Sequence, residues 1–195
     1  MNLDPVQIRI LEKAEELFLK YGYSKTKMEE IASSLKISRK TLYKYYSNKQ
    51  DLMEFYMDYK QNEIQKVIQE IANDETLTAV QKFSKMHRSL VEESPYVMND
   101  LFIREISEMF PLQVERFKKR REKEIPESIG KIFNMAKMKG ELRDGFMPEV
   151  AVHLFLASIE MILSNKNSIT VPLNIHEFQL EVVNVIFMEC LRGKT

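Results

Sequence analysis

Several residue types are scarce in this chain of 195 residues, and each shortage removes a class of structure. Cys190 is the only cysteine, so the chain cannot form an internal disulfide, and a reducing compartment suits it best. Glycine is rare while leucine, lysine and glutamate are frequent, which favours helices throughout. No apolar run has the length to cross a bilayer, and the N-terminus lacks a signal-peptide core. We therefore expect an all-α protein in the cytoplasm, with no membrane partner.

The sequence patterns of catalysis are also missing. The three histidines, His87, His153 and His176, lie far apart and do not have the spacing of metal ligands. No phosphate-binding glycine loop, dinucleotide glycine pattern or G-x-S-x-G nucleophile turn occurs. We expect no enzymatic activity, no metal site and no cofactor. The alternative is an enzyme with a helical body, and turnover of a substrate by the purified protein would favour it.

Residues 27–49, KMEEIASSLKISRKTLYKYYSNK, have the pattern of two short helices joined by a tight turn. Four residues of the first helix recur at helical spacing and form an apolar face: Met28, Ile31, Ala32 and Leu35. Ser38 is placed to cap the second helix, over residues 39–46, since its hydroxyl can accept a first-turn N–H. Leu42 and Tyr46 lie four residues apart and are expected to point into the core. The segment therefore predicts a helix-turn-helix.

The opposite face of the second helix is basic and aromatic. Its outward residues are Arg39, Lys40, Thr41, Tyr43 and Lys44. Such a face suits the major groove of double-stranded DNA, where cations meet phosphates and Arg or Lys can read guanine. A solvated surface helix and a domain that binds another protein are the alternatives. The turn, the cap and the basic face occur together here, and this combination favours DNA.

The formal net charge of zero conceals an asymmetry between the two ends of the chain. Residues 1–50 contain ten Lys and Arg against six Asp and Glu, whereas residues 51–195 contain nineteen against twenty-three. A basic head on an acidic body is expected of a protein that binds DNA with its N-terminal end only. We therefore predict a DNA-binding domain over residues 1–49 and a larger helical body over residues 50–195.

Two stretches of the head, ILEKAEELFLKYGYSKTKMEEIA and TLYKYYSNKQDL, resemble the TetR family of bacterial one-component repressors. The resemblance covers about residues 8–52, with Ala14, Phe18 and Gly22 where the family usually has alanine, an aromatic residue and glycine. It implies a three-helix DNA-binding head on a helical body that binds a small-molecule effector and forms a homodimer.

By this resemblance, two groups of residues contact DNA. Those that match phosphate-contacting positions are Thr26, Tyr43, Tyr45 and Lys49. Those that match positions at or near base edges are Arg39, Lys40, Thr41 and Lys44. Lys36 departs from the family, which usually has glycine in this turn. A lysine in a left-handed turn conformation would cost roughly 1 kcal/mol, although it would also be placed to add a phosphate contact.

The body is expected to consist of helices over about residues 77–92, 96–108, 112–139, 148–163 and 174–191. Ser47 is expected to cap a long helix that runs to about Ile71 and joins the head to the body. Pro126 predicts a kink in the helix over residues 112–139, because a mid-helix proline removes one hydrogen bond. Asn174 is the expected cap of the last helix.

The central helices of the body mix methionines with phenylalanines. Thioethers beside aromatic rings suit an adaptable apolar pocket, and the resemblance implies that an effector, of unknown identity, binds there. The candidate lining residues are Phe83, Met86, Phe102, Ile106, Met109, Phe110, Phe117 and Phe133. For any one of these residues, plain core packing is the stronger interpretation.

The last two helices, VAVHLFLASIEMIL and FQLEVVNVIFMECL, are apolar around most of their circumference. They are either buried core helices or, as the resemblance implies, a pair that packs against its copy in a homodimer. The candidate interface residues are Val150, Leu154, Ala157, Ile159, Met161, Val183, Phe187 and Met188. We expect a homodimeric repressor on a palindromic operator, with half-sites about one DNA turn apart. An activator, or a protein that acts through protein partners, is the alternative.

Overall fold

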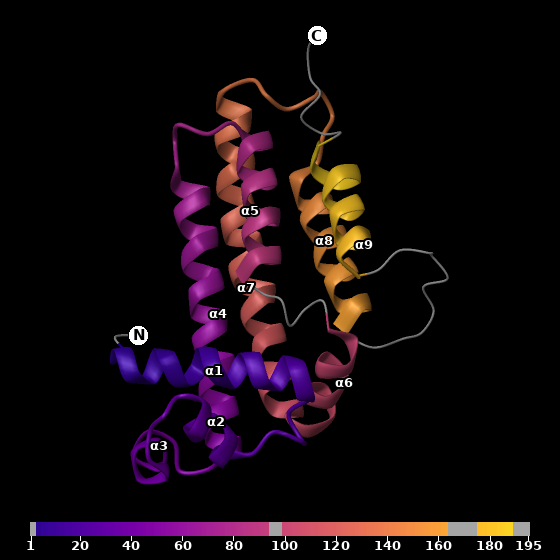
Figure 1. Cartoon of the computed structure of the whole chain (residues 1–195). Helices are drawn as coiled ribbons and strands as arrows, with labels where there is room; N and C mark the ends of the chain where they lie inside the picture. The colour runs from indigo at the N-terminus through magenta and orange to yellow at the C-terminus, as the bar shows by residue number, and fades with distance from the viewer. Residues whose placement is uncertain (1–2, 94–98, 164–174, 189–195) are drawn as a thin grey trace. The chain divides into compact units, whose positions relative to one another are not determined.

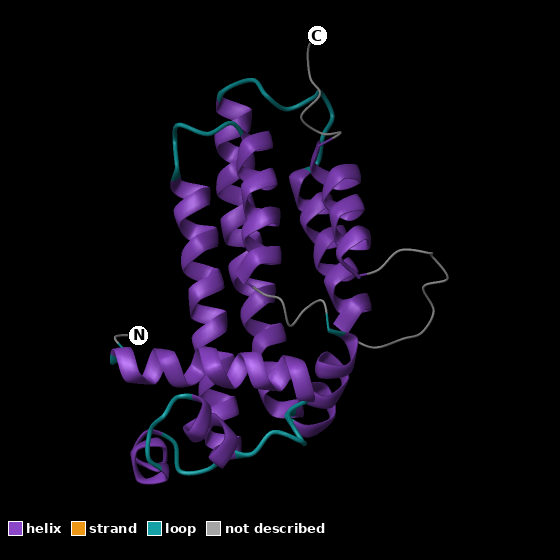
Figure 2. Cartoon of the chain, in the orientation of Figure 1, coloured by secondary structure: helices purple, strands orange, loops and turns teal. Residues whose placement is uncertain are grey.

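The computed structural model describes residues 3–93, 99–163 and 175–188, and every regular element within these ranges is a helix (Figure 1; Figure 2). The all-α prediction is therefore confirmed. In chain order the helices are α1 (Pro5–Tyr21), α2 (Met28–Ser34), α3 (Arg39–Tyr45), α4 (Lys49–Asn73), α5 (Ala79–Glu93), α6 (Asp100–Met109), α7 (Pro111–Met138), α8 (Pro148–Leu163), α9 (Ile175–Val183) and the π-helical η2 (Asn184–Met188). Within the described ranges, no helix has both the length and the apolar character needed to cross a membrane.

Ser38 caps the helix that the sequence predicts it to cap, and neighbouring residues also set the two ends of α1. Asp4 caps α1, since its side chain accepts the N–H of Val6 at 2.7 Å. Gly22 ends α1 with a φ of 88°, a conformation that glycine adopts without steric cost. Ser38 caps α3 by accepting the N–H of Thr41 at 3.0 Å. These ends are determined by residues adjacent in sequence.

The cap of α4 is not the predicted one. The side chain of Asn48 accepts the N–H of Asp51 at 2.9 Å, so Asn48 caps the helix in place of Ser47. Ser47 supports the same turn differently, because its N–H and its hydroxyl donate to the Asp51 carboxylate at 2.7 and 2.8 Å. The helix then continues to Asn73, two residues past the predicted end.

The later helices differ from the prediction mainly at their ends. α6 begins at Asp100 rather than near residue 96, because Asn99 accepts a first-turn N–H. α7 continues through Pro126, so the predicted kink does not divide it into two helices. α9 ends at Val183 and gives way to η2. The predicted cap of this helix, Asn174, lies outside the described residues.

The chain forms two compact units. Unit 1 comprises Met1–Glu63 and Asn99–Glu115, and unit 2 comprises Ile64–Met98 and Arg116–Thr195. This division differs from the predicted boundary after residue 49. The first part of α4 and the whole of α6 belong to the unit that contains α1, α2 and α3. Unit 1, which contains the predicted DNA-binding head, therefore includes a segment that is distant in sequence.

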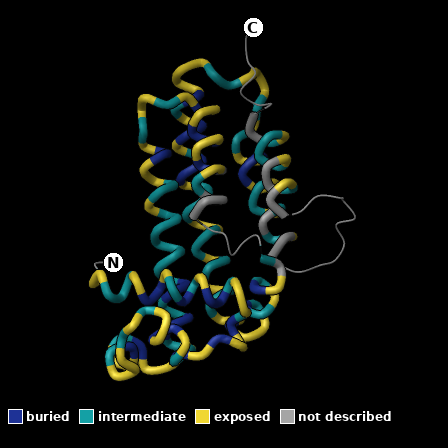
Figure 3. Tube along the Cα trace, viewed as in Figure 1, coloured by how far each residue is buried: buried dark blue, intermediate teal, exposed yellow. Residues whose placement is uncertain are grey.

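Unit 1 is built around the apolar face of α1, whose buried positions are dark blue in Figure 3. Its fully buried side chains include Ile10, Leu11, Phe18, Ile31, Leu42, Tyr46, Leu52 and Met53. The predicted core positions Leu42 and Tyr46 are thus confirmed. Tyr23, in the turn between α1 and α2, has its ring centroid 5.4 Å from that of Phe18 and 5.2 Å from that of Phe110. These aromatic contacts join α1 and the residue after α6 to the turn between α1 and α2.

Unit 2 has an apolar core of its own. Its buried residues are Ile71, Ala72, Ala79, Phe83, Met86, Ile129, Ile132, Phe133, Ala136, Ala151 and Val152. Phe133 is 1% exposed, and its ring centroid lies 5.5 Å from that of Phe83 and 5.1 Å from that of Phe146. A cation also enters this core. Lys82 is 1% exposed, and its Nζ donates to the carbonyl of Ala72 at 2.7 Å.

Candidate nucleic-acid interface

The outer face of α3 exposes the residues that the sequence predicts. Arg39, Lys40, Tyr43 and Lys44 are exposed, with 72% of the Arg39 side chain open to solvent. Thr41 is half-buried, and its hydroxyl oxygen lies 2.8 Å from that of Ser38, which caps the helix. The first turn of α3 is therefore fixed by side chains as well as by its backbone. A helix with one buried edge and a cationic outer edge meets the requirements of a major-groove contact.

Arg39 has a partner on the neighbouring helix that the sequence pattern does not reveal. Glu29 of α2 lies 3.7 Å from the Arg39 guanidinium. The pair is exposed and therefore weak, because solvent screens it and both side chains lose freedom when they pair. Its consequence is geometric, since it places a carboxylate beside the first cation of α3.

Lys36 adopts the left-handed conformation that its place in the turn predicts, with a φ of 55°. Its own N–H and that of Ile37 donate to the carbonyls of Ser33 and Ala32, both at 3.0 Å, and so close the end of α2. The lysine side chain is exposed. The strain of roughly 1 kcal/mol is therefore retained at a position where an ammonium group can reach a phosphate.

Tyr45 is half-buried, and its hydroxyl is engaged within the head. It donates to the Asp4 carboxylate at 3.0 Å and so links the end of α3 to the start of α1. This hydrogen bond, with burial as a smaller cause, raises the pKa of Tyr45. The Lys44 ammonium lies 5.9 Å from the centroid of the Tyr45 ring. Asp4 therefore caps α1 and also orients a predicted phosphate contact.

Thr26 is buried, although the resemblance implies that it contacts a phosphate. The residue is 1% exposed. Its hydroxyl lies 2.9 Å from the carbonyl oxygen of Gly22 and 3.2 Å from that of Leu17. The side chain therefore stabilises the junction between the end of α1 and the turn after it, and it does not present its hydroxyl at the surface.

Lys49 is also engaged within the head. Its Nζ donates to the carbonyl oxygens of Tyr23, Ser24 and Thr26 at 2.9, 3.1 and 3.0 Å. The ammonium also lies 4.4 Å from the centroid of the Tyr23 ring. Burial lowers the pKa of Lys49, and the charge of Glu105 opposes that change. An ammonium has three N–H donors, so these three carbonyls use all of them.

The carboxylate of Glu105, on α6, binds backbone N–H groups of the same turn. Its two carboxylate oxygens accept the N–H groups of Tyr23 and Ser24, each at 2.7 Å. Burial alone would raise the pKa of Glu105, but these hydrogen bonds and the charge of Lys49 hold it below its usual value. The sequence gives no signal for this contact, because Glu105 lies more than 80 residues from the turn.

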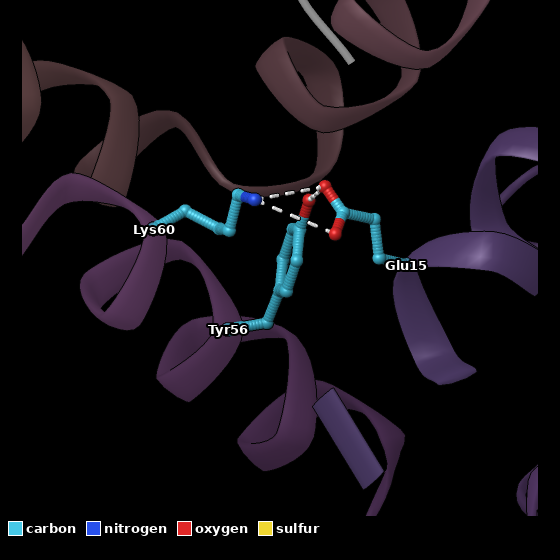
Figure 4. Close-up of polar contacts among 3 residues, drawn as sticks. All are labelled: Glu15, Tyr56 and Lys60. Atoms are coloured by element: carbon cyan, nitrogen blue, oxygen red, sulfur yellow. Dashed lines mark hydrogen bonds and ion pairs between the residues drawn. The ribbon is translucent and has the colours of Figure 1, made fainter. Parts of the chain in front are cut away.

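A second polar cluster of unit 1 joins α1 to α4, as Figure 4 shows. The Tyr56 hydroxyl donates to the Glu15 carboxylate at 2.8 Å, and the Lys60 ammonium lies 3.3 Å from the same oxygen. The Lys60 and Glu15 side chains are only 12% and 16% exposed. The cluster therefore fixes the first part of α4 to the helix that carries the core of the head.

The head also matches a known protein family by sequence. Residues 10–54 match the profile of the bacterial regulatory proteins of the tetR family, and they contain α2, α3 and most of α1. The match assigns the head, residues 10–54, to the tetR family. The chain is therefore a DNA-binding transcriptional regulator with a tetR-type head. This assignment of the head supports the expectation that the protein is not an enzyme.

Relatives of the chain align with nearly its whole length. YvaF of Bacillus subtilis strain 168, an uncharacterised HTH-type transcriptional regulator, is 25% identical over 182 residues, which are 92% of each protein. A transcriptional regulator from Cytophaga hutchinsonii is 23% identical, with 96% of this chain and 100% of that one covered and a TM-score of 0.70. SmeT, the repressor of the Stenotrophomonas maltophilia multidrug efflux pump SmeDEF, is 14% identical, with 95% and 90% covered and a TM-score of 0.60. The two solved structures show that the fold is shared.

The candidate pocket residues of the chain divide between the two units. Phe102, Ile106, Met109 and Phe110 belong to unit 1, whereas Phe83, Met86, Phe117 and Phe133 belong to unit 2. Most are buried, but Met109 is 51% exposed and Phe117 is half-buried. Phe110 packs on Tyr23, and Phe83 packs on Phe133, each within the core of its own unit. The effector site remains a prediction.

The candidate interface residues on α8 form an exposed apolar stripe. Val150, Leu154, Ala157 and Met161 recur at i, i+4, i+7 and i+11, and all four are exposed. Val183 of α9 is half-buried against the core of unit 2. The side chains of Ile159, Phe187 and Met188 lie outside those that the structure describes. Among the described candidates, those on α8 fit an interface and Val183 fits the core.

Proposed function

We propose that this protein is a homodimeric repressor of the TetR family that binds a palindromic operator through two copies of α3. An apolar or amphipathic small molecule would release it from the operator. The outer face of α3 is the observation that carries the DNA-binding part of the proposal. The exposed residues of this face are Arg39, Lys40, Tyr43 and Lys44, and Leu42 on the opposite face of the helix is buried. Basic side chains on the outer face of a helix that is anchored in a core can reach base edges in the major groove.

The proposed contacts divide into those that position the head and those that read sequence. Phosphates would be held by Lys36 and Tyr43. Base edges would be met by Arg39, Lys40, Thr41 and Lys44. Thr26, Tyr45 and Lys49 are not among the proposed direct contacts, because their donors are already engaged by oxygen atoms within the head.

The exposed stripe on α8 supports a homodimer. Val150 and Leu154 are 46% and 55% exposed, and Met161 is 36% exposed. Apolar side chains that share one helix face in this way mark a surface that a partner covers. A two-fold dimer would present two α3 helices to the two halves of a palindromic site. The relative SmeT is a repressor, which favours repression over activation here.

The DNA-binding proposal is tested with a duplex taken from just upstream of the protein's own gene, compared with a scrambled duplex at two salt concentrations. Arg39→Ala should weaken binding to the specific duplex by about 10- to 100-fold, the value of one good base contact. Arg143→Ala is the matched control, since Arg143 is exposed in unit 2 and takes no part in the proposed interface. Equal effects of the two substitutions would contradict the assignment of α3.

The same titration with the wild-type protein tests whether the protein binds DNA at all. Selective, salt-dependent binding to the upstream duplex supports the regulator, and if the duplex is not the operator, selection from a random DNA pool replaces it. Binding to no selected duplex would reject DNA as the partner. A transcription assay from a promoter that carries the bound sequence then separates repression from activation by the sign of the change.

The dimer proposal is tested by sedimentation at micromolar concentration. Leu154→Glu places a charge in the centre of the α8 stripe and should shift the protein from dimer to monomer. Leu112→Glu is the matched control, because Leu112 is an 80% exposed leucine of unit 1, whereas the stripe belongs to α8 of unit 2. A wild-type monomer, or a Leu154→Glu variant that stays dimeric, would contradict an interface on this stripe.

A further inference from the structure

The turn between α1 and α2 has more backbone polar groups than it can satisfy by itself. α1 ends at Tyr21 and α2 begins at Met28. Between them the N–H of Thr26 donates to the carbonyls of Gly22 and Tyr23 at 3.3 and 3.2 Å, whereas the N–H groups of Tyr23 and Ser24 donate to no backbone carbonyl of the described residues. Buried backbone N–H and C=O groups require partners. Tyr23 is 4% exposed, which makes its own groups costly to leave unpaired.

Two side chains from other helices of unit 1 supply those partners. Glu105 of α6 accepts the N–H groups of Tyr23 and Ser24, and Lys49 of α4 donates to the carbonyls of Tyr23, Ser24 and Thr26. The Glu105 carboxylate thus pairs with two N–H donors of the turn, and the Lys49 ammonium pairs with three of the turn's carbonyl acceptors. Hydrogen bonds in which one partner is charged are roughly twice as strong as neutral ones.

Further contacts hold α6 at the same place. The Asn99 side chain, at the start of α6, donates to the carbonyl of Leu19 near the end of α1 at 3.2 Å. At the other end of α6, the Phe110 ring packs edge-on against Tyr23. Gly22 lies close to the carboxylate, since a Cβ at this position would stand 3.3 Å from the Glu105 Oε2 atom. Both ends of α6 and its central carboxylate are therefore joined to the end of α1.

We propose that Glu105 and Lys49 are positioning residues for DNA binding, which hold the α1–α2 turn between them and so set the placement of α2 and α3. This inference rests on the proposed function, since it concerns how α3 is presented to DNA. We call the two side chains and the backbone of residues 23–26 the turn clasp. The clasp makes α6 a necessary part of the DNA-binding head, although it lies far along the chain.

The clasp makes predictions opposite to those of a direct phosphate contact by Lys49. If Lys49 contacts a phosphate, its loss should reduce the salt dependence of binding by about one counterion. Glu105 would then be a nearby negative charge that repels DNA, and its neutralisation should strengthen binding. If the clasp holds the turn, loss of either charge should weaken binding, and the salt dependence should stay unchanged.

The test measures affinity for the operator at several salt concentrations with Glu105→Gln, Lys49→Met and the double variant. Glutamine can accept only one of the two N–H groups, because its amide nitrogen would face the other donor. We expect about tenfold weaker binding for each single variant, the usual effect of a lost charge-assisted hydrogen bond. The double variant should be weaker than either single variant by much less than the product, because the two side chains hold the same turn.

Glu108→Gln is the matched control. Glu108 lies on the same helix, is exposed, and undergoes the same change of charge. It should leave affinity unchanged or raise it slightly, since a negative charge is removed from a DNA-binding unit. Far-UV circular dichroism at the assay temperature verifies that each variant is folded. Amide exchange in the wild-type protein gives a second readout, in which the N–H groups of Tyr23 and Ser24 should be protected.

Three results would overturn the proposal. The first is a Glu105→Gln variant that binds DNA as tightly as the wild type or more tightly. The second is a Lys49→Met variant whose salt dependence falls by about one counterion, which would return Lys49 to the phosphate contacts. The third is rapid exchange of both turn amides in the wild-type protein. If the wild type binds no duplex at all, the proposed function fails first, and the positioning role fails with it.

Discussion

The α1–α2 turn of unit 1 and the α4–α5 turn of unit 2 are held by the same chemistry in different surroundings. In the first, Lys49 donates to carbonyls and Glu105 accepts N–H groups. In the second, Lys82 donates to a carbonyl of the last turn of α4 at 2.7 Å, and Glu141 accepts the first N–H of α5 at 3.0 Å. Each turn is thus fixed by a cation and a carboxylate that lie outside it, although Lys82 lies on the helix that directly follows its turn.

The two turns differ in the burial of the cation and in the element to which each turn leads. Lys82 is 1% exposed within an apolar core, and burial lowers its pKa, with the charge of Lys139 acting in the same direction. Lys49 is half-buried beside an aromatic ring. The turn held by Lys82 leads only into α5, whereas the turn held by Lys49 leads into the helix-turn-helix. The same arrangement therefore serves stability alone in unit 2, and stability together with the placement of α3 in unit 1.

Substitution of the buried Lys82 tests how the α4–α5 turn of unit 2 is held, and it should have the largest effect on stability. Lys82→Ala loses both the packing of the aliphatic stem and the hydrogen bond to the α4 carbonyl, for a cost of about 3 kcal/mol. Lys82→Met keeps most of the stem and should lose about half as much. Urea unfolding measures both changes. Operator affinity of the folded protein should stay unchanged, in contrast to Lys49→Met.

Lys85→Ala is the control for this pair, because Lys85 lies on the same helix and is exposed. Its effect should stay within about 0.5 kcal/mol. A Lys82→Met variant as stable as the wild type would show that the buried ammonium contributes nothing beyond its stem. The analogy between the two turns would then fail.

Removal of the buried hydroxyl of Thr26 tests the role of side-chain hydrogen bonds in the α1–α2 turn of unit 1. Thr26→Val keeps the shape of the side chain and removes the donor to the carbonyls of Gly22 and Leu17, so stability should fall by about 1–2 kcal/mol. The salt dependence of DNA binding should stay as in the wild type, because the hydroxyl faces the interior. A decrease in that dependence by about one counterion would instead restore the phosphate contact that the family resemblance implies.

The parts of the fold that could be predicted depend on adjacent residues. The Asp4 and Ser38 caps, the glycine that ends α1 and the start of α8 at Pro148 are all set by local hydrogen bonding and backbone restriction. The exposed face of α3 is predicted by helical periodicity for the same reason. These features need no knowledge of how distant segments pack.

The parts that could not be predicted depend on segments that meet only in the folded chain. Family resemblance marked Thr26 and Lys49 as important positions, but it did not reveal that carbonyls of the head already engage their donors. Glu105 carried no sequence signal, because its partners are backbone groups that any residue could provide. The candidate pocket was similarly divided, since an apolar residue such as Phe110 does not show in sequence which core it joins.

Tyr46 has a buried polar atom without a partner among the described residues of unit 1, and it predicts a gain in stability. Its hydroxyl is buried and has no hydrogen-bond partner among the described residues, and burial raises its pKa. Tyr46→Phe should therefore raise the free energy of unfolding by about 1 kcal/mol. Tyr56→Phe is the opposite control, because the Tyr56 hydroxyl donates to Glu15 and its loss should lower stability by a similar amount. Changes of the same sign in thermal unfolding would contradict this interpretation.

The smallest expected change in stability is at Lys36, where conformation and function separate. Lys36→Gly relieves the left-handed strain at a φ of 55°, but glycine also loses more conformational freedom on folding. These two effects oppose each other, so stability should change by less than about 0.5 kcal/mol. DNA affinity should nevertheless fall, and the salt dependence should decrease by about one counterion, if the exposed ammonium meets a phosphate. A gain in stability with unchanged salt dependence would instead mean that this lysine only strains the turn. The ammonium of Lys49 has all its donors engaged within the head. The ammonium of Lys36 is exposed instead, and we expect it to contribute to DNA binding rather than to stability.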